Sequence, residues 1–274
     1  MLAEAQDLSF QPVTASANRR LTPEHIARYN TDGFCQPVGI FDADEIREIR
    51  AYVDGLISDM GEAGHYGINC YQARLSGIYD IAADPRILDC VEDIIGPNVL
   101  CWATAILSKE PRDPKRVPWH QDASFWKLDP ARTVTVWLAI DDADENNSAM
   151  RFIPGTHSMG ALPESERDGA SVFHKGTADA ETLGKPFTNT LKAGQISLHA
   201  DMLVHGSLAN ASDRRRCGLT LRYCPPEVRI TDPDWARGVE AILCRGTPED
   251  WRTHPRPDNN DITKTSSPHV VGNN

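Results

Sequence analysis

Hydrophobic residues recur with a helical period in the first third of the chain. Apolar positions between residues 42 and 57 are spaced three or four apart and form one stripe, which is typical of a helix packed on a core. Thr22 and Asp84 are polar residues that each precede a proline, a pattern that favours the start of a helix. We therefore predict helices over residues 23–32, 42–57 and 85–95.

From residue 98 the pattern changes to short β-branched and aromatic runs that end at Gly and Pro turns. Helices followed by many short strands are typical of a β-sandwich or barrel with a helical layer outside it. The pattern predicts strands over residues 99–107, 133–140, 150–153, 187–191, 195–199 and 216–223.

The chain has 274 residues, a length at which one domain is favoured for a β-rich protein. A polar stretch with several glycines interrupts the strands and is expected to be a lid or binding loop. We expect a loose N-terminal arm over residues 1–20 and a mostly helical layer over residues 21–97. A β core is expected over residues 98–228, with the lid at 158–186, and a poorly ordered tail over residues 249–274.

The charge balance limits the partners. There are 28 Lys and Arg against 39 Asp and Glu, a net charge of −11, which argues against a nucleic acid or an anionic membrane surface. No run of apolar residues is long enough to span a bilayer, and the first ten residues lack the basic start of a secretory signal. The 7 cysteines are scattered and odd in number, which favours reduced thiols in a cytoplasmic protein.

The candidate chemistry begins with His120 and Asp122, two residues apart, and a distant His205. Two imidazoles and one carboxylate are the ligand set that holds a non-heme Fe(II) and leaves three positions open. If His120 and Asp122 lie on a strand, alternation places both side chains on one face. The motif alone is weak, because the chain repeats it at His199 and Asp201.

Context separates the two copies. His120 lies between two predicted strands, where a barrel mouth places ligands. We therefore interpret His199 as a hydrogen-bonded strand residue near the metal ligands and Asp201 as a turn residue. An arginine shortly after His205 can clamp the far carboxylate of a dicarboxylate cosubstrate. Arg216 is the preferred candidate; Arg214 shares its face if the strand begins early, whereas Arg215 points the other way.

Four segments resemble the phytanoyl-CoA dioxygenase family of Fe(II)/2-oxoglutarate-dependent oxygenases. They are LTPEHIARYNTDGF, PWHQDASFW, VTVWLAIDDADENNSAMRFIPGTHS and HGSLANASDRRRCGLTLRY, and they span most of residues 21–224. The resemblance implies a double-stranded β-helix (a cupin-like jelly roll) with helices packed on one sheet. It also implies that His120, Asp122 and His205 are the catalytic iron ligands.

The resemblance further assigns a cosubstrate pocket. Arg216, with Ser207 beside it, would bind the far carboxylate of 2-oxoglutarate, and Gln121 and Trp137 would line the pocket. His157 is expected to be structural or to lie behind the ligands. One departure is the turn Asn147-Ser148, where the family has Asn-Gly; because Asn tolerates positive φ, the turn can survive.

The implied reaction uses O2 and 2-oxoglutarate, releases succinate and CO2, and hydroxylates a C–H bond of a small molecule. Halogenating relatives have a small residue at the position of Asp122, so its carboxylate favours hydroxylation. Two alternatives stay open: a non-catalytic jelly-roll binding protein and a zinc hydrolase with the same ligands. The zinc hydrolase would need a general base and would have no use for Arg216.

The substrate is expected to be a small molecule handled by a monomer or homodimer. One hypothesis is that Arg112, Lys115 or Arg116 contacts an anionic group of this substrate, because the segment from residue 101 to 132 is mildly basic. A solvated surface loop is the favoured alternative for these three residues.

Overall fold

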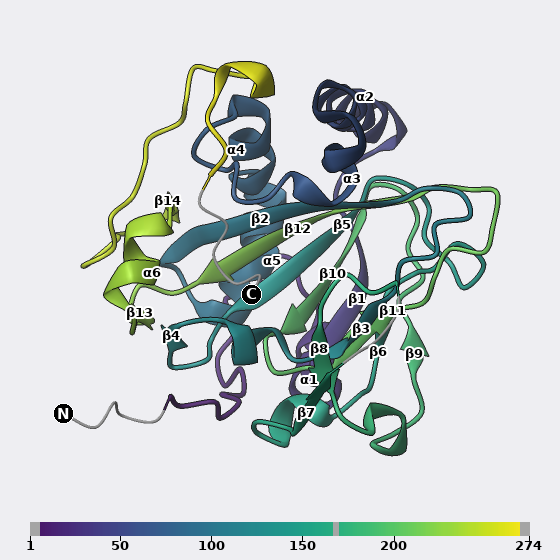
Figure 1. The fold of residues 1–274 in the computed structure, drawn as a ribbon. Coiled ribbons are helices and arrows are strands. Elements are labelled where there is room, and N and C mark those ends of the chain that lie inside the picture. Colours follow the sequence, from purple (N-terminus) through teal and green to yellow (C-terminus); the bar gives the residue numbers. More distant parts are fainter. Residues whose placement is uncertain (1–5, 167–169, 269–274) are drawn as a thin grey trace.

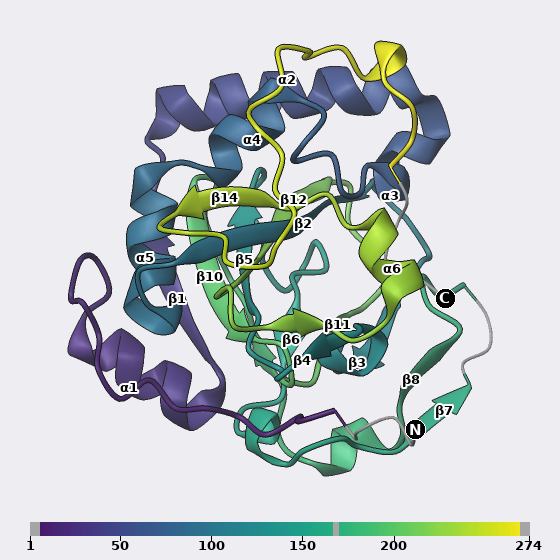
Figure 2. The ribbon, with the colours of Figure 1, turned by 90° about the vertical axis from the view of Figure 1, so that its left-hand side faces the viewer.

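Two antiparallel sheets face each other and enclose the interior of the protein (Figures 1 and 2). The computed structural model describes residues 6–166 and 170–268. The larger sheet has six strands in the order β1 (Phe34–Gly39), β10 (Gln195–Ala200), β5 (Val134–Ala139), β12 (Arg216–Cys224), β2 (Val99–Lys109) and β14 (Ile242–Arg245). The smaller sheet has four strands in the order β3 (Val117–His120), β11 (His205–Ser207), β6 (Arg151–Phe152) and β9 (Phe187–Thr188).

Helices cover the outer face of the larger sheet, with α2 and α4 above β2, β12 and β5 in Figure 1. The described helices are α1 (Pro23–Asp32), α2 (Ala43–Met60), α3 (Gly64–Gly67), α4 (Ser76–Ala82), α5 (Pro85–Ile95) and α6 (Pro233–Gly238). The three helices predicted from the sequence are confirmed, and Thr22, Asp42 and Asp84 accept backbone hydrogen bonds as their N-caps. No described helix has both the length and the apolar character needed to cross a bilayer.

β12 separates the hydrophobic core from the interior cavity. Its odd-numbered residues, from Cys217 to Tyr223, are buried in the core cluster that also contains the helices' apolar faces. Its even-numbered residues face the other sheet, because side chains alternate along a strand. Arg216, Thr220 and Arg222 accordingly line a cavity between the two sheets.

The six predicted strands are present, with the bounds given above. Eight further described strands escaped prediction, four of them in the two main sheets. Two of the others, β4 (Leu128–Asp129) and β13 (Arg229–Ile230), pair with each other. β1 contains Pro37 and Gly39, which mask the strand pattern but are tolerated because β1 is an edge strand. β3 and β11 are too short to display a period, and β14 lies beyond the predicted β core. The lid segment contains a small hairpin of β7 (Glu164–Glu166) and β8 (Lys175–Thr177).

The described parts of the N-terminal arm and the tail are held more firmly than the sequence suggested. Residues 6–22 form no helix or strand, yet the Asp93 carboxylate accepts hydrogen bonds from the amides of Arg19, Arg20 and Leu21. In the tail, Ile262 is buried in the core. Residues 1–5 and 269–274 of these two segments, and 167–169 of the lid, lie outside the described residues.

Candidate metal and cosubstrate site

Two of the three candidate metal ligands lie on the short strands β3 and β11, and the third lies in the turn that follows β3. His120 ends β3 and lies opposite His205, the first residue of β11, in the antiparallel register. Asp122 begins a 3₁₀ helix, Asp122–Phe125, and is not part of the strand. The residue between them, Gln121, still has an extended backbone (φ −108°, ψ 121°), so the alternation expected from the sequence places the Asp122 carboxylate on the side of the His120 imidazole.

The ligand atoms converge on one point. One ligand atom from each of the three residues lies within 4.8 Å of the others. The Asp122 carboxylate is 3.6 Å from Nε2 of His120 and 4.0 Å from Nε2 of His205. All three side chains are buried, and they lie where a divalent ion could take all three at once.

Backbone carbonyls fix the orientation of both imidazoles. Nδ1 of His120 lies 2.8 Å from the carbonyl oxygen of Pro118, and Nδ1 of His205 lies 2.9 Å from that of Leu203. A carbonyl only accepts, so each Nδ1 carries the proton and donates it. The lone pair of each Nε2 then points at the shared site, as in metal centres whose histidines are held from behind.

The electrostatics of the site keep Asp122 ionised and His205 neutral. Burial opposes ionisation of Asp122, but the Arg222 guanidinium and the two imidazoles hold the pKa of its carboxyl well below the ordinary value. Burial also lowers the pKa of His205 well below that of a free imidazole. A carboxylate and neutral imidazoles are the protonation states that metal binding requires.

Arg216 lies in the same cavity, 2% exposed, with only neutral partners. Its Nε donates to the carbonyl oxygen of Ser148 at 3.0 Å, and a terminal nitrogen donates to Oγ of Ser207 at 3.2 Å. The indole of Trp137 lies beside it, with the ring centroid 5.7 Å from the guanidinium carbon. The structure thus brings together three of the four residues predicted to bind the cosubstrate.

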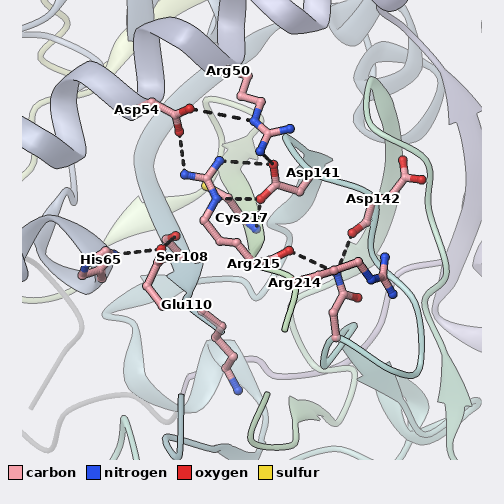
Figure 3. A network of polar contacts seen from close by, with 12 residues as sticks. Arg50, Asp54, His65, Ser108, Glu110, Asp141, Asp142, Arg214, Arg215 and Cys217 are labelled. Atoms are coloured by element: carbon pink, nitrogen blue, oxygen red, sulfur yellow. Dashed lines mark hydrogen bonds and ion pairs between the residues drawn. The ribbon is translucent and has the colours of Figure 1, made fainter. Parts of the chain in front are cut away.

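The neighbouring arginines are engaged elsewhere. Arg214 pairs with Asp144 at 2.8 Å on the surface. Arg215 points to the helical side, where it binds Asp141 at 2.8 Å and Asp54 at 2.6 Å (Figure 3). The competition among the three arginines is therefore decided by the direction of each side chain, and only Arg216 enters the cavity.

Gln121, the fourth predicted cosubstrate residue, does not line this cavity. Its amide nitrogen donates to the carbonyls of Gly160 and Met202, and its oxygen accepts from the amide of Leu162. These bonds tie the start of the lid to the segment between β10 and β11. The side chain points away because it follows His120 in an extended backbone, where neighbouring side chains diverge.

The turn that departs from the family pattern uses Ser148, and not Asn147, for the left-handed conformation. Ser148 has φ of 68°, a value that glycine adopts more easily. The Asn147 side chain instead bridges the carbonyls of Asp142 and Arg215. This conformation of Ser148 contributes to the site, because the carbonyl oxygen of Ser148 accepts the hydrogen bond from Arg216.

The family described as phytanoyl-CoA dioxygenase (PhyH) matches residues 29–218, which contain the three metal-ligand candidates and Arg216. The chain belongs to the phytanoyl-CoA dioxygenase family.

Individual relatives of the phytanoyl-CoA dioxygenase family are distant. The peroxisomal phytanoyl-CoA dioxygenase of Bos taurus is 25% identical over 155 residues, covering 54% of this chain and 46% of the bovine protein. The chain therefore matches about half the length of such curated relatives. The L-proline trans-4-hydroxylase of Streptomyces griseoviridis is 21% identical over 234 residues, covering 72% of this chain and 84% of that enzyme.

Solved structures agree with the predicted jelly roll. The non-heme monooxygenase ThoJ, in its apo form, has a TM-score of 0.73 and 28% identity, covering 85% of this chain and 88% of that one. EctD from S. alaskensis, solved with 2-oxoglutarate and 5-hydroxyectoine, has a TM-score of 0.68 and 20% identity, covering 82% of this chain and 85% of that one.

Several cavity residues of this family member were missed or misread from the sequence. Thr220 and Arg222 line the cavity; their even spacing from Arg216 along β12 was a signal that could have identified them. His199 also lines the cavity, and neither of its ring nitrogens has a hydrogen-bond partner, so its interpretation as a hydrogen-bonded strand residue is wrong. Burial lowers the pKa of His199 to about 4.

The remaining histidine and acidic candidates lie outside the cavity. His157 contacts the carbonyl oxygen of Asn30 through Nε2 at 3.1 Å and packs edge-on against Phe10, as expected for a structural residue. Asp201 lies in the turn after β10, and its carboxylate accepts from the amide of Thr133 at 2.8 Å.

The three basic residues considered for substrate binding are also elsewhere. Arg112 pairs with Asp213, and Lys115 lies over the ring of Tyr66. Arg116 lines a neighbouring depression that shares Val117 and Ser207 with the cavity.

Proposed function

We propose that this protein is an Fe(II)/2-oxoglutarate-dependent dioxygenase that hydroxylates a C–H bond of a small-molecule metabolite. The reaction consumes the substrate, O2 and 2-oxoglutarate, and yields the hydroxylated product, succinate and CO2. The observation that carries the proposal is the convergence of three metal ligands and one unpaired, buried arginine on a single cavity.

The donor set suits ferrous iron. Two neutral imidazole nitrogens and one carboxylate, from His120, His205 and Asp122, bind such an ion and leave adjacent positions for a bidentate cosubstrate and O2. The bound iron supplies the oxidising power that the side chains of a protein lack. The residues themselves supply the orientation, since the carbonyls behind both imidazoles prevent the rings from turning away.

Arg216 supports 2-oxoglutarate as the cosubstrate. No carboxylate of a described residue pairs with this guanidinium, and burial lowers its pKa. A buried, unpaired cation is costly, so a ligand carboxylate at this position would stabilise it. The far carboxylate of 2-oxoglutarate can form a charge-assisted fork with Arg216 and accept a further hydrogen bond from Ser207.

The lid favours a reaction that must exclude water. Phe173, from the loop after β7, packs edge-on against the His120 ring with 4.9 Å between ring centroids. It also lies 6.1 Å from the ring of Phe125, so aromatic carbon covers one side of the metal ligands. Closure of this kind protects reactive species from solvent.

The alternatives fit less well. A zinc hydrolase would have no use for Arg216. A non-catalytic jelly-roll binding protein could use Arg216 to hold an anion, but it would have no reason to keep three metal ligands beside it. Hydroxylation is preferred over halogenation because the carboxylate of Asp122 occupies the position that a halide would need.

The test is anaerobic titration of the protein with Fe(II) and 2-oxoglutarate, followed by admission of air. A weak visible absorption band on chelation, and succinate release after air, are expected. His205→Ala should abolish both signals, whereas His254→Ala is a matched control, because His254 is partly exposed and lies outside the cavity. A wild-type protein that shows neither the band nor succinate would contradict the proposed function.

A further inference from the structure

A row of polar side chains without partners crosses the inner face of the larger sheet. His199 on β10 lies opposite Thr135 on β5, and Thr135 lies opposite Arg222 on β12. All three line the cavity that contains the metal ligands. We call His199, Thr135 and Arg222 the polar row.

Each member of the polar row has buried polar atoms with no hydrogen-bond partner. These atoms are both ring nitrogens of His199, Oγ1 of Thr135 and Nε of Arg222. Buried polar groups are nearly always satisfied, because a buried donor or acceptor without a partner destabilises the folded state. Three such residues side by side, on the wall of one cavity, therefore indicate a surface that a polar ligand completes.

Arg222 determines the charge of that ligand. No ion pair is formed by its guanidinium among the described residues, and its carbon lies 5.2 Å from the ring centroid of Trp126. Stacking on an indole fixes the plane of the guanidinium and leaves its edge available to an acceptor. A fork of this kind matches a carboxylate, which accepts two parallel hydrogen bonds.

The charges of the assembled site lead to the same conclusion, on the condition that the proposed function is correct. The ferrous ion and Arg216 together balance Asp122 and the two carboxylates of 2-oxoglutarate. Arg222 also attracts the Asp122 carboxylate, but that charge is already counted against the metal ion. Arg222 is therefore the cation of the cavity wall that is left without a counterion of its own. A substrate with one negative charge would neutralise it.

We propose that the substrate of this enzyme is a small carboxylic acid whose carboxylate binds Arg222 and the polar row. The hydroxyl of Thr135 donates a hydrogen bond to the same carboxylate, and one ring nitrogen of His199 donates another. The carboxylate is then fixed at one side of the cavity, and the hydrocarbon part extends over the metal ligands toward Phe173. Arg216 and Arg222 lie at opposite ends of the inner face of β12. Arg216 binds the cosubstrate, and Arg222 binds the substrate.

The test compares acids with their uncharged isosteres in the assembled site. Protein loaded with Ni(II), which prevents turnover, and 2-oxoglutarate is titrated by calorimetry with benzoate, phenylacetate, 3-phenylpropionate and hexanoate, and with the primary amide of each. At least one acid is expected to bind in a one-to-one ratio and about 10- to 100-fold more tightly than its amide. Arg222→Gln should remove that preference and leave the affinity for 2-oxoglutarate unchanged.

Two further variants make the result specific. Arg229→Gln removes an exposed arginine on β13 (Arg229–Ile230) and should retain the full preference for the acid. Thr135→Val keeps the shape of the side chain and removes only the hydroxyl, so acid binding should weaken about threefold to tenfold. Thr135→Val also provides the test if Arg222→Gln fails to fold.

The outcomes separate this inference from the proposed function. A wild-type protein that binds neither Ni(II) nor 2-oxoglutarate contradicts the proposed function itself. A protein that binds both, yet prefers no acid over its amide, contradicts only the carboxylate site. An acid preference that survives Arg222→Gln, or an equal loss of 2-oxoglutarate binding in that variant, also overturns the assignment of Arg222.

Discussion

Gly218 on β12 provides the space that the indole of Trp137 occupies, and adding one methyl group there tests how the cosubstrate pocket is built. A Cβ at residue 218 would lie 2.2 Å from Cζ2 of Trp137 and 2.8 Å from its Nε1. Ordinary van der Waals contact begins near 3.4 Å, so the indole must move by more than about 1 Å. Trp137 is 1% exposed and has little free space into which it can move.

We expect Gly218→Ala to affect both stability and cosubstrate binding. Overpacking of a buried site costs about 1–3 kcal/mol, which corresponds to a fall in melting temperature of roughly 2–5 °C for a chain of this size. Because Trp137 lies beside the Arg216 guanidinium, its displacement should also weaken 2-oxoglutarate binding, by about tenfold. Thermal unfolding and calorimetric titration of the Ni(II)-loaded protein measure the two effects.

Gly39→Ala is the matched control, since a Cβ at residue 39 would have nothing within 4 Å. Trp137→Phe removes Cζ2 and Nε1, so combining it with Gly218→Ala should cost less than the sum of the two single changes. Gly218→Ala and Gly39→Ala proteins with equal melting temperatures and equal 2-oxoglutarate affinities would contradict the packing described for Trp137.

Three further expectations follow from the structure. Arg216→Gln should raise the dissociation constant for 2-oxoglutarate about 100-fold, and Arg216→Lys about tenfold, because lysine keeps the charge and loses the fork; calorimetry on the Ni(II)-loaded proteins checks both, and unchanged binding would exclude Arg216. Burial raises the pKa of Asp201 to about 7 from the ordinary 3.8, so the native carboxyl holds its proton more tightly than the unfolded chain does. The contribution of Asp201 to stability is therefore greatest below pH 4 and falls as the pH rises toward 7. Asp201→Asn should therefore gain stability relative to the wild type across that interval, by up to about 4 kcal/mol, and unfolding curves at pH 5 and pH 8 with equal differences would refute it. Asp141→Ala should destabilise the protein by about 3 kcal/mol in urea unfolding, since it leaves Arg215 and the amide of Cys217 without their shared acceptor (Figure 3); a change under 1 kcal/mol would show that Asp54 alone satisfies Arg215.

Local patterns along the chain were sufficient for the elements that have a clear period and clear ends. The helix from Ala43 to Met60 combines one apolar stripe with an N-cap at Asp42, and both signals depend on residues close in sequence. The same holds for the longer strands, such as β5 and β12. β3 and β11 were missed because three or four residues display no period, and their existence depends on pairing with each other.

The ligand types could also be predicted, but only part of their geometry could. His120, Asp122 and His205 were expected at one site, and they are there. Asp122 lies in a 3₁₀ turn and not on the strand, although the extended backbone at Gln121 keeps its carboxylate on the side of His120. The approach of His205 depends on the pairing of β3 with β11. The identity of the residue with positive φ, Ser148, was likewise decided by the bonds that the neighbouring Asn147 makes to distant carbonyls.

The sequence by itself determined the helices, the longer strands and the residue types at the candidate metal site, and it favoured Arg216 over its two neighbours. Tertiary structure alone decided that Gln121 turns to the lid, and that His199, Thr135 and Arg222 stand in one row. The physical reason is the range of the interactions. Helical and strand periods arise between residues a few positions apart, whereas a row across a sheet depends on the register of three strands separated by some 60 to 90 residues.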